Sequence, residues 1–479
     1  MRKRILTAAV AAATLASGAQ AAGFYLKELS ITGQGRAFAG EVTNTEDAAA
    51  VYFNPAATAG MTDSKNLTVG AHAIAPDSKL TNTGTLFSNG VNTNVETAGA
   101  ETKNPYGTSL IPNIYATMPL ENGSVLGFGV NNPFGLANQY EKDSFVRYDS
   151  TETELKTPSF NFSLAKQLND KLSFGFGIEA QKGEAILESA LPLSATALGY
   201  TSQVSSNVYA PAAIIGDINS RLEAETGFEL APFVGITYQM SDETQLGFSY
   251  RSGIDHTASG KVLLTPNTSA VADGDAFEAT ITSLAIGQGA TPVAAATLAA
   301  QARGAGSYTI NNAKAELSTP SIASFGVKHA VSDSTRVYAD ATFYEWSAFD
   351  EIVITTSTVS RQVQGYKDTM SYALGAEHTY SDQLTMRAGV MFDPTPTVDE
   401  YRSARTPDAD RTWLAIGGTY SIEENMDFDF AFTHILLDET ILEQDKALTL
   451  GGSPLGTAQI RADGEGSVNI LSLGLRYKF

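Results

Sequence analysis

The sequence of 479 residues contains no cysteine, and basic residues are few. The absence of cysteine excludes disulfide bridges, thiolate metal sites and thiol catalysis together. Only 31 Lys and Arg stand against 52 Asp and Glu, which gives a formal charge of −21. Because the neutralisation of phosphates needs a surplus of Lys and Arg, a nucleic-acid partner is excluded.

Long apolar runs are missing too. Beyond the first 21 residues no stretch of about 18 apolar residues occurs, so no transmembrane helix is expected. The chain begins with basic residues at 2–4, an apolar core at 5–16, and small residues at Ala19 and Ala21. This pattern is typical of a secretory signal peptide, so we expect residues 1–21 to be removed from an exported protein; a retained anchor is the alternative. Any membrane residence must then use strands.

From Ser64 onward, large apolar residues alternate with small or polar ones over about ten positions at a time. Residues 172–178, 384–392 and 426–433 show the alternation clearly. The pattern predicts β-strands with one apolar face. A soluble β-sandwich would show the same alternation, so the pattern alone leaves both folds open.

The spacing of turns favours a membrane barrel, in which tight turns alternate with long loops. Six tight turns rich in Asn, Asp, Ser or Gly are predicted at residues 121–123, 169–170, 241–243, 332–334, 381–382 and 423–425. Each turn joins two strands, and one further strand is left at each end of the chain. The prediction is an all-β fold: a 14-stranded antiparallel transmembrane β-barrel over residues 63–479.

Two long segments near residues 190–221 and 265–313 are rich in Ala, Thr, Ser and Gly, and are expected to be outer loops. Residues 293–301 of the second favour a short helix. These loops are either a landing site for hydrophobic molecules or variable decoration, and the sequence does not decide between the two.

The carboxyl end, residues 471–479, has apolar residues at its odd positions and finishes on Phe479. It resembles the closing strand by which outer-membrane barrels are recognised, which implies the barrel-assembly machinery as a partner. The alternative is a soluble edge strand.

Residues 22–62 precede the barrel and do not follow the strand pattern, because small residues and turn formers dominate. A compact segment of this length is most simply placed inside the lumen as a plug. A disordered periplasmic tail is the alternative.

The sequence resembles the FadL-type family of outer-membrane transporters for long-chain fatty acids and other hydrophobic compounds. The resemblance covers essentially the whole mature chain. The motifs that carry it are Ala22-Gly23-Phe24, Gly33-x-Gly35-Arg36-Ala37, Gly40, Asp47-Ala48, Asn54-Pro55-Ala56, Asn132-Pro133-Phe134-Gly135-Leu136, Glu345-Trp346-Ser347-x-Phe349, Tyr366-Lys367-Asp368 and Pro407-Asp408-x-Asp410-Arg411-x-Trp413-Leu414.

The resemblance implies a 14-stranded barrel with an N-terminal hatch (residues 22–62) in the bacterial outer membrane. It further implies passive uptake of a hydrophobic molecule by loop capture, lumen binding, hatch movement and lateral exit. No cofactor or metal is implied, and we expect a monomer in contact with outer-membrane lipid and lipopolysaccharide. The positions matched to the hatch are Ala22, Gly23, Phe24, Gly33, Gly35, Arg36, Gly40, Asn54, Pro55 and Ala56. Arg36 is expected to pair with a lumen carboxylate, either Asp47 or one from the wall.

The exit maps onto the strand that begins at Val125, because Pro133 cannot donate to a β-ladder and pairing should fail near it. The alternative is that Pro133 begins an outer loop. The residues of the predicted exit are Asn131, Asn132, Pro133, Phe134 and Gly135.

The ligand stays open. Fatty-acid carriers of this family hold the carboxylate with basic residues, yet Gln181 to Glu184 and Asp350 to Val353 bring few of them. Arg147, Lys182 and Lys328 are the candidates to bind a head group, although a solvated or ion-paired lumen residue is the simpler interpretation of each. Neutral aromatic hydrocarbons of the toluene type are therefore the first alternative.

Other functions find little support in the sequence. The five histidines lack metal-ligand spacing and no Gly-x-Ser-x-Gly elbow occurs, so no enzyme is expected and an outer-membrane lipase is the weakest alternative. A general diffusion porin would have an open lumen, and residues 22–62 argue against it.

Overall fold

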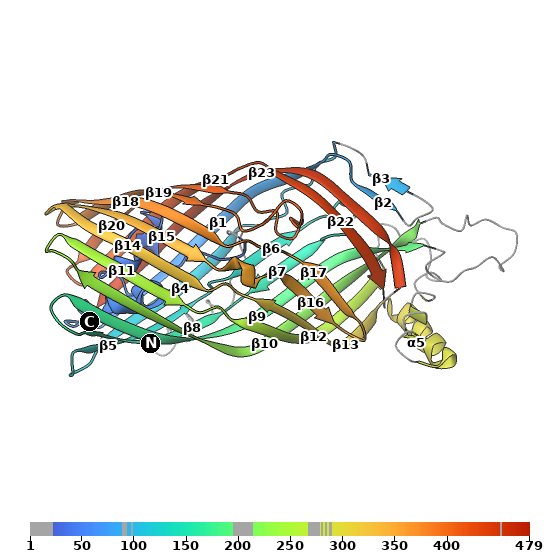
Figure 1. Ribbon diagram of the computed structural model, residues 1–479, viewed down its shortest axis with the longest axis horizontal. Coiled ribbons are helices and arrows are strands. Elements are labelled where there is room, and N and C mark those ends of the chain that lie inside the picture. Colours follow the sequence, from blue (N-terminus) through green and yellow to red (C-terminus); the bar gives the residue numbers. More distant parts are fainter. Residues whose placement is uncertain are drawn as a thin grey trace, which may run out of the picture.

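The protein is described by a computed structural model that covers residues 23–88, 93–96, 99–194, 214–266, 278, 281–282, 285–286, 290–450 and 453–479. The predicted signal peptide, Ala22, residues 195–213 of the first predicted outer loop and most of residues 267–289 of the second lie outside the described residues. The bounds of the first predicted loop were wrong, because residues 190–194 and 214–221 continue the flanking strands. The fold is all-β with few helices (Figure 1).

Fourteen of the described strands form a closed antiparallel ring, as the turn spacing predicted. Each strand pairs with the next one around the ring, and the first and last strands pair with each other from Asn66–Lys478 to Asn82–Ala462. The ring strands are β1 (Asn66–Asn82), β4 (Ser109–Pro119), β5 (Ser124–Asn131), β8 (Ser159–Gln167), β9 (Leu172–Ser194), β10 (Ile214–Gln239), β11 (Thr244–Arg251), β14 (Ile322–Ser332), β15 (Thr335–Tyr344), β18 (Thr369–Ser381), β19 (Leu384–Asp393), β20 (Arg411–Glu423), β21 (Met426–Leu437) and β23 (Ser453–Lys478).

All six predicted tight turns join neighbouring ring strands: β4 to β5, β8 to β9, β10 to β11, β14 to β15, β18 to β19, and β20 to β21. The turns and the carboxyl end lie together at the left of Figure 1. Along much of the ring strands, side chains alternate between a buried inner face and an outer face that carries many exposed apolar residues. Phe176 and Ile178 of β9 are 50% and 51% exposed, and Leu473 of β23 is 48% exposed, as expected where lipid rather than water covers the outer face.

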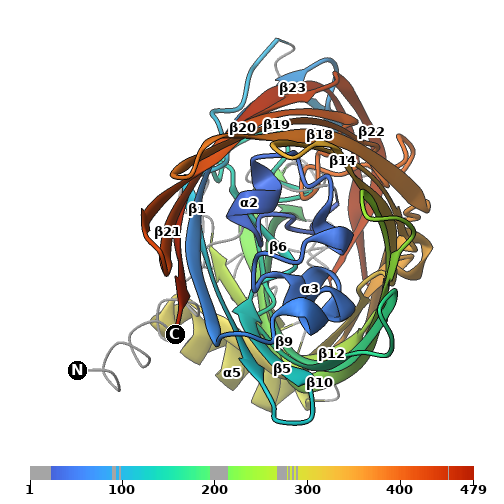
Figure 2. The ribbon, with the colours of Figure 1, turned by 90° about the vertical axis from the view of Figure 1, so that its left-hand side faces the viewer.

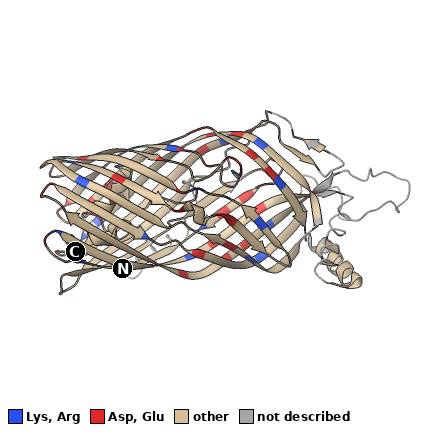
Figure 3. Cartoon of the chain, viewed as in Figure 1, with Lys and Arg blue, Asp and Glu red and all other residues tan. Residues whose placement is uncertain are grey.

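At the end opposite to the tight turns, several ring strands are longer than their neighbours in the ring, and shorter strands pair with these extensions (Figure 1). Figure 3 shows that charged residues of the near wall gather in this outer half, with others at the tight turns. The additional elements are β2 (Leu86–Ser88), β3 (Thr93–Val95), β6 (Gly135–Gln139), β7 (Glu152–Lys156), β12 (Asp255–Pro266), α5 (Pro292–Ala305), β13 (Tyr308–Ser318), η3 (Trp346–Ala348), β16 (Glu351–Thr355), β17 (Val359–Val363) and β22 (Thr440–Leu450). Helix α5 covers the segment for which a helix was predicted.

The amino-terminal segment, residues 23–61, forms short helices and turns: α2 (Ile31–Gln34), η1 (Glu41–Thr43), α3 (Ala50–Phe53) and η2 (Pro55–Gly60). Figure 2 shows α2 and α3 within the ring of strands. Nearly all of its side chains are buried. Its polar groups bond strands on different sides of the ring: Thr68 of β1 donates to Asp47 (2.9 Å), and Asn54 donates to the Ile236 carbonyl of β10 (3.1 Å).

Candidate functional site

The β-ladder of the wall is interrupted at the end of β5. β5 ends at Asn131, and its pairing with β4 stops at Ile114–Val130, although β4 continues back to Ser109 along β1. The next strand, β6, pairs with β7. The break lies where Pro133 predicted a failure of pairing, since proline has no N–H to donate.

The first residues of the amino-terminal segment take up the strand edge that follows the break. We call residues 23–29 the arm. Leu26 N donates to the Pro133 carbonyl (2.8 Å), and Gly135 N donates to the Phe24 carbonyl (2.8 Å). Tyr25 and Phe134 thus form an antiparallel bridge. The Thr157 hydroxyl bonds both the N–H and the carbonyl of Phe134 (2.9 and 2.8 Å), which satisfies backbone groups that have left the wall.

An aromatic cluster surrounds the Phe24 side chain. Its ring centroid lies 4.9 Å from those of Trp346 and Phe349, with both of which it makes edge-to-face contact, and 5.7 Å from that of Phe134, to which it is tilted. Tyr366 packs against both Trp346 (5.7 Å) and Phe349 (4.9 Å). Three sequence motifs, at residues 132–136, 345–349 and 366–368, therefore meet at the arm.

The start of the arm is held by a fourth motif. Gly23 N donates to Asp408 Oδ2 (2.8 Å), and the Arg411 guanidinium donates to the other oxygen of the same carboxylate. Lys27 lies 3.4 Å from Asp393 of β19. Glu28 is fully buried, and neither of its carboxylate oxygens has a hydrogen-bond partner among the described residues. Burial raises the pKa of Glu28 to about 7.

Arg36 is paired with carboxylates, as predicted, but Asp47 is not its partner. It lies 3.2 Å from Glu41 of its own segment and 3.2 Å from Glu377 of β18. Glu377 also lies 2.6 Å from Arg387 of β19. Asp47 instead accepts hydrogen bonds from Thr32 (2.8 Å) and from Thr68. The partner from the wall was expected by type but could not be named from the sequence.

The glycines matched to the hatch lie at close contacts. A Cβ atom at Gly33 would lie 2.3 Å from the Glu41 side chain, and one at Gly40, whose φ is +84°, would lie 2.2 Å from Tyr338. Gly35 faces Gly417 of β20, and a Cβ atom added at Gly35 would lie 3.2 Å from the Cα atom of Gly417. The packing leaves no room for larger residues at Gly33 and Gly40.

The Asn54-Pro55-Ala56 triplet forms the start of η2. The Asn54 side chain accepts from Ala56 N (3.1 Å) and donates to the Val42 carbonyl (2.7 Å), while Pro55 occupies the first helical positions. The triplet therefore links η2, η1 and β10 through one buried amide.

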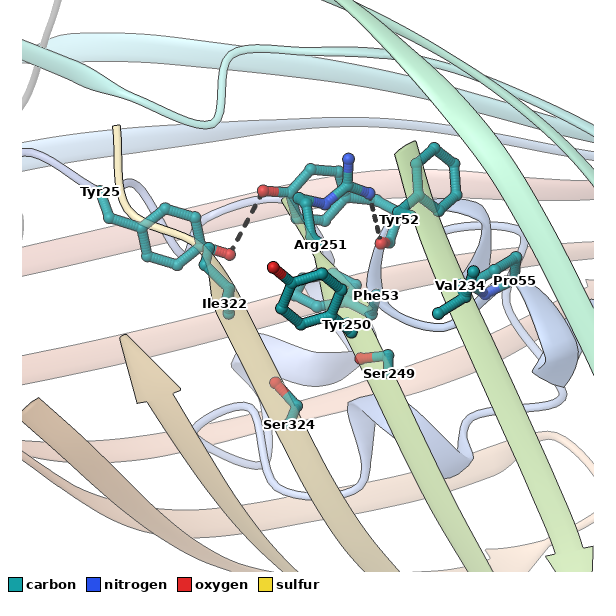
Figure 4. A pocket seen from close by; sticks show the side chains of 11 residues that line it. Tyr25, Tyr52, Phe53, Pro55, Val234, Ser249, Tyr250, Arg251, Ile322 and Ser324 are labelled. Atoms are coloured by element: carbon teal, nitrogen blue, oxygen red, sulfur yellow. Dashed lines mark hydrogen bonds between the residues drawn. The ribbon is translucent and has the colours of Figure 1, made fainter. Parts of the chain in front are cut away.

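A small cavity of about 30 Å³ lies between the amino-terminal segment and β10, β11 and β14 (Figure 4). Arg251 of β11 lies 4.0 Å from the ring centroid of Tyr52 and 4.3 Å from that of Phe233, and donates to the Tyr52 carbonyl (2.7 Å). The Tyr52 hydroxyl donates to that of Tyr25 (3.4 Å). A neighbouring cavity beside Lys27 measures about 40 Å³. Because one water needs roughly 10–15 Å³ by this measure, each cavity holds only a few waters.

A larger cavity of about 170 Å³, which we call the outer pocket, lies in the outer half of the molecule. Sequence reasoning missed it, because its walls come from distant parts of the chain. Its apolar lining comes from β9, β10, β12, β13, β16 and β22, with Ser and Thr residues between the apolar ones. Two basic residues, Arg405 and Lys446, also line it. The apolar residues of the lining are Leu187, Leu191, Leu222, Val262, Leu264, Ile310, Ile354, Ala447 and Leu448.

The three candidates for a head-group site are not brought together, and none of them lines the outer pocket. Arg147 lies 2.9 Å from Glu96 and 3.0 Å from Asp217. Lys182 of β9 lies 2.9 Å from Glu184 and 2.8 Å from Glu225. Lys328 lies on β14, opposite Tyr338 and Gln245 and four residues before the end of the strand at its tight turn. Their role in binding stays a prediction.

Within the described residues, no group of three or more His, Asp or Glu side chains is arranged to hold a metal ion. Among the same residues, no helix has the length and the apolar composition needed to cross a membrane.

A closed 14-stranded antiparallel ring with an apolar outer face and tight turns at one end is an outer-membrane β-barrel of bacterial type. The model of the family described as "Outer membrane protein transport protein (OMPP1/FadL/TodX)" matches residues 12–479. The chain belongs to this family, whose members are transporters of the bacterial outer membrane.

Individual relatives agree with this assignment. The chain is 27% identical over 439 residues to the long-chain fatty acid transport protein of Escherichia coli O6:H1, which covers 89% of this chain and 90% of that one. Its fold is similar to that of a Pseudomonas aeruginosa FadL homologue, with a TM-score of 0.78, 22% identity and coverage of 96% and 100%. It is also similar in fold to the Pseudomonas putida toluene transporter TodX, with a TM-score of 0.58, 16% identity and coverage of 90% and 94%.

Proposed function

We propose that the protein carries long-chain fatty acids, or similar hydrophobic molecules, passively across the outer membrane. The ligand enters the outer pocket, passes toward the arm, and leaves sideways through the wall near Pro133. The interruption of the ladder between β4 and β5 carries this proposal, because β4 continues from Asn113 back to Ser109 beyond its last pair with β5, and Pro133 has no N–H with which to extend that pairing.

A lateral exit suits a hydrophobic ligand for a physical reason. Each methylene group that enters water costs about 0.8 kcal/mol, so a long acyl chain released into the periplasm would lose much of the free energy of its apolar contacts. Release through the wall transfers the chain from the apolar lining of the pocket to lipid. No nucleotide is needed if the ligand is removed downstream.

We propose that residues 23–61 are a hatch that closes the lumen and that the arm is its moving part. Two observations support this role. The cavities beside Tyr25 and Lys27 are too small for an acyl chain. The arm also occupies the edge of β6 beside the wall break, with the Phe24 ring in the aromatic cluster. Ligand arrival would displace Phe24 and free that edge.

The E. coli relative is named a long-chain fatty acid transport protein, which supports a fatty acid as ligand. A second candidate, uptake of neutral aromatic hydrocarbons of the toluene type, is favoured by the aromatic cluster around Phe24. Rings of Trp346, Phe349 and Phe134 present edges and faces that suit a small aromatic molecule once Phe24 moves away.

Replacement of Asn132 and Pro133 by the strand-forming pair Thr and Val tests the exit. The new residues can donate to a ladder, so β5 should extend along β4 and close the wall. We expect uptake of labelled oleate by cells to fall at least several-fold, with the amount of folded barrel unchanged. Folded barrel is quantified by heat-modifiable migration on a gel.

The matched control is Pro454→Val. Pro454 is exposed at the beginning of β23, far from the break, so this change should leave uptake unaltered. Uptake at the parental rate by the Asn132 and Pro133 variant, per folded barrel, would rule out a lateral exit at this place.

A further inference from the structure

The outer face of the wall changes from apolar to charged at one level of β9 and β10. Ile178, Lys182 and Glu184 of β9 are separated by even numbers of positions, so they share the outer face. Lys182 lies opposite Phe228 of β10, which is 56% exposed, and Glu184 lies opposite Glu225. Because the end of the apolar band of a barrel marks the edge of the hydrocarbon layer, lipid head groups begin at the level of Lys182.

A groove of about 600 Å³ begins at that edge and lies on the outer face of β7, β9, β10, β12 and β13. The outer pocket lies on the opposite face of β9, β10 and β12, since neighbouring side chains of a strand point to opposite sides. Leu187 and Leu222 line the outer pocket, whereas Ile186 and Glu223 line the groove. Figure 3 shows charged residues along these strands. The charged residues that line the groove are Glu154, Lys156, Glu184, Glu223, Glu225 and Lys261.

The lysines at the groove pair with carboxylates of the same or of the neighbouring strand. Lys182 lies between two of them, 2.9 Å from Glu184 and 2.8 Å from Glu225. Lys261 lies 3.2 Å from Glu223. These groups are accessible, since the side chains of Lys261 and Glu225 are 51% and 68% exposed. Exposed ion pairs contribute little to stability, so folding alone does not explain their concentration at this level, and a ligand can exchange them at small cost.

Two neighbouring asparagines complete the groove because β13 carries a bulge there. Gly260 of β12 pairs with Ala313 and Lys261 pairs with Asn311, so Asn312 is the extra residue. Its φ is +61°, a left-handed conformation that Asn tolerates better than most residues. Both asparagines are exposed and line the groove. Their amides offer donors and acceptors of the kind that sugar hydroxyls need.

The position and the chemistry of the groove together define its occupant. A molecule at the edge of the hydrocarbon layer places apolar chains beside Phe228 and Leu230, both exposed, and its polar head in the groove. Lysines bind phosphate, carboxylates suit the divalent cations that accompany phosphates, and the asparagine amides suit a sugar. An inorganic anion would leave the apolar border uncovered, and a phospholipid without a sugar would leave the amides unused. A phosphorylated glycolipid meets all of these conditions.

We propose that this groove binds the phosphorylated sugar head of lipopolysaccharide, the glycolipid of the outer leaflet. Lys156, Lys182 and Lys261 bind its phosphates, and the carboxylates of the groove bind the divalent cations that bridge them. Asn311 and Asn312 bond hydroxyls of the sugar, and the acyl chains lie along the apolar face below. The site lies on the outer surface of the barrel and does not depend on which ligand the lumen carries.

The test is equilibrium binding of fluorescently labelled lipid A, with both of its phosphates, to the full mature protein in dodecyl maltoside and Mg²⁺, with protein-free micelles as the blank. We expect the triple variant Lys156→Gln, Lys182→Gln and Lys261→Gln to bind lipid A about tenfold more weakly or worse, because each lysine near a membrane surface adds to the attraction of anionic lipid. Lipid A with one phosphate and removal of Mg²⁺ by a chelator should each weaken binding to the parent several-fold. Heat-modifiable migration confirms that the variant is folded.

The matched control is the triple variant Lys79→Gln, Lys103→Gln and Arg461→Gln. It removes the same charge from ion-paired residues that do not line the groove, and its affinity for lipid A should stay within about twofold of the parent. Equal affinity of the groove variant and the parent would overturn the proposal. So would an equal loss in the control variant, which indicates attraction to any positive charge of the outer half, or binding of phosphatidylglycerol as tight as that of lipid A, which indicates a surface for any anionic lipid.

Discussion

At the scale of single residues, Glu28 is the charged group of the arm whose burial is least compensated. Lys27 and Arg411 favour its charged form and Asp393 opposes it, yet burial has the larger effect and raises its pKa to about 7. Because the docked arm binds a proton that a solvated glutamate releases near pH 4.5, docking should weaken as pH rises from about 4.5 to 7. At 1.36 kcal/mol per pKa unit the change is at most about 3 kcal/mol.

The protein contains two tryptophans, Trp346 beside Phe24 and Trp413 beside Phe38. In a Trp413→Phe background, emission from Trp346 therefore reports docking of the arm. We expect this emission to shift to longer wavelength between pH 5 and pH 8, and expect Glu28→Gln to abolish the shift. The same response in both proteins would show that another group is titrating.

Residue roles were only partly predictable from the sequence. The pairing of Arg36 with a wall carboxylate follows from the cost of a buried charge, but Glu377 lies 341 positions away and nothing local identifies it. Arg405 was missed for the same reason. Its loop gives no signal of its own, and its hydrogen-bond partners lie more than two hundred residues earlier in the chain.

At the scale of elements, the strands and turns were predictable because their signals are local. Alternation with a period of two marks each strand, and Asn, Asp, Ser and Gly mark each tight turn. The interruption after Asn131 was predictable as well, since the missing N–H of Pro133 acts on its immediate neighbours. The docking of the arm against β6 was not, because it joins backbone groups about 110 residues apart.

The contact between the amino-terminal segment and the wall depends on glycines of the strands. A Cβ atom at Gly389 of β19 would lie 2.1 Å from the Arg36 carbonyl oxygen, which no adjustment of a side chain relieves. We expect Gly389→Val to undock the segment and to raise single-channel conductance in planar bilayers several-fold.

Gly227→Val is the matched control, because nothing lies within 4 Å of a Cβ atom at Gly227. Its conductance should equal that of the parent. If folded Gly389→Val barrels also conduct like the parent, the segment does not close the lumen.

At the scale of the whole molecule, the ring places the site. Because β1 and β23 pair with each other, the start of the first ring strand and the end of the last one both lie at the side of the tight turns. The amino-terminal segment, which precedes β1 in sequence, then lies within the ring of strands. Motifs around residues 24, 134, 346–366 and 408 are separated in the chain and meet only because the ring is closed. The number of strands could be predicted from the spacing of turns. Which residues meet at the site could not, because that depends on how the ring closes.

The central claim is that the arm must leave the wall break for the ligand to exit. The Tyr25–Phe134 bridge offers a direct test, because the hydrogen bonds on either side of it make this a pair whose Cα atoms lie about 4.5 Å apart, within the range of a disulfide. The chain has no other cysteine, so a Tyr25→Cys and Phe134→Cys double variant can form only this bridge within one molecule.

The measurement is oleate uptake by cells that carry the double variant, before and after treatment with a reductant, with the two single variants as controls. The account predicts that the oxidised double variant binds oleate but takes it up at least tenfold more slowly than the single variants, and that reduction restores uptake. Uptake by the oxidised protein at the rate of the single variants would contradict it.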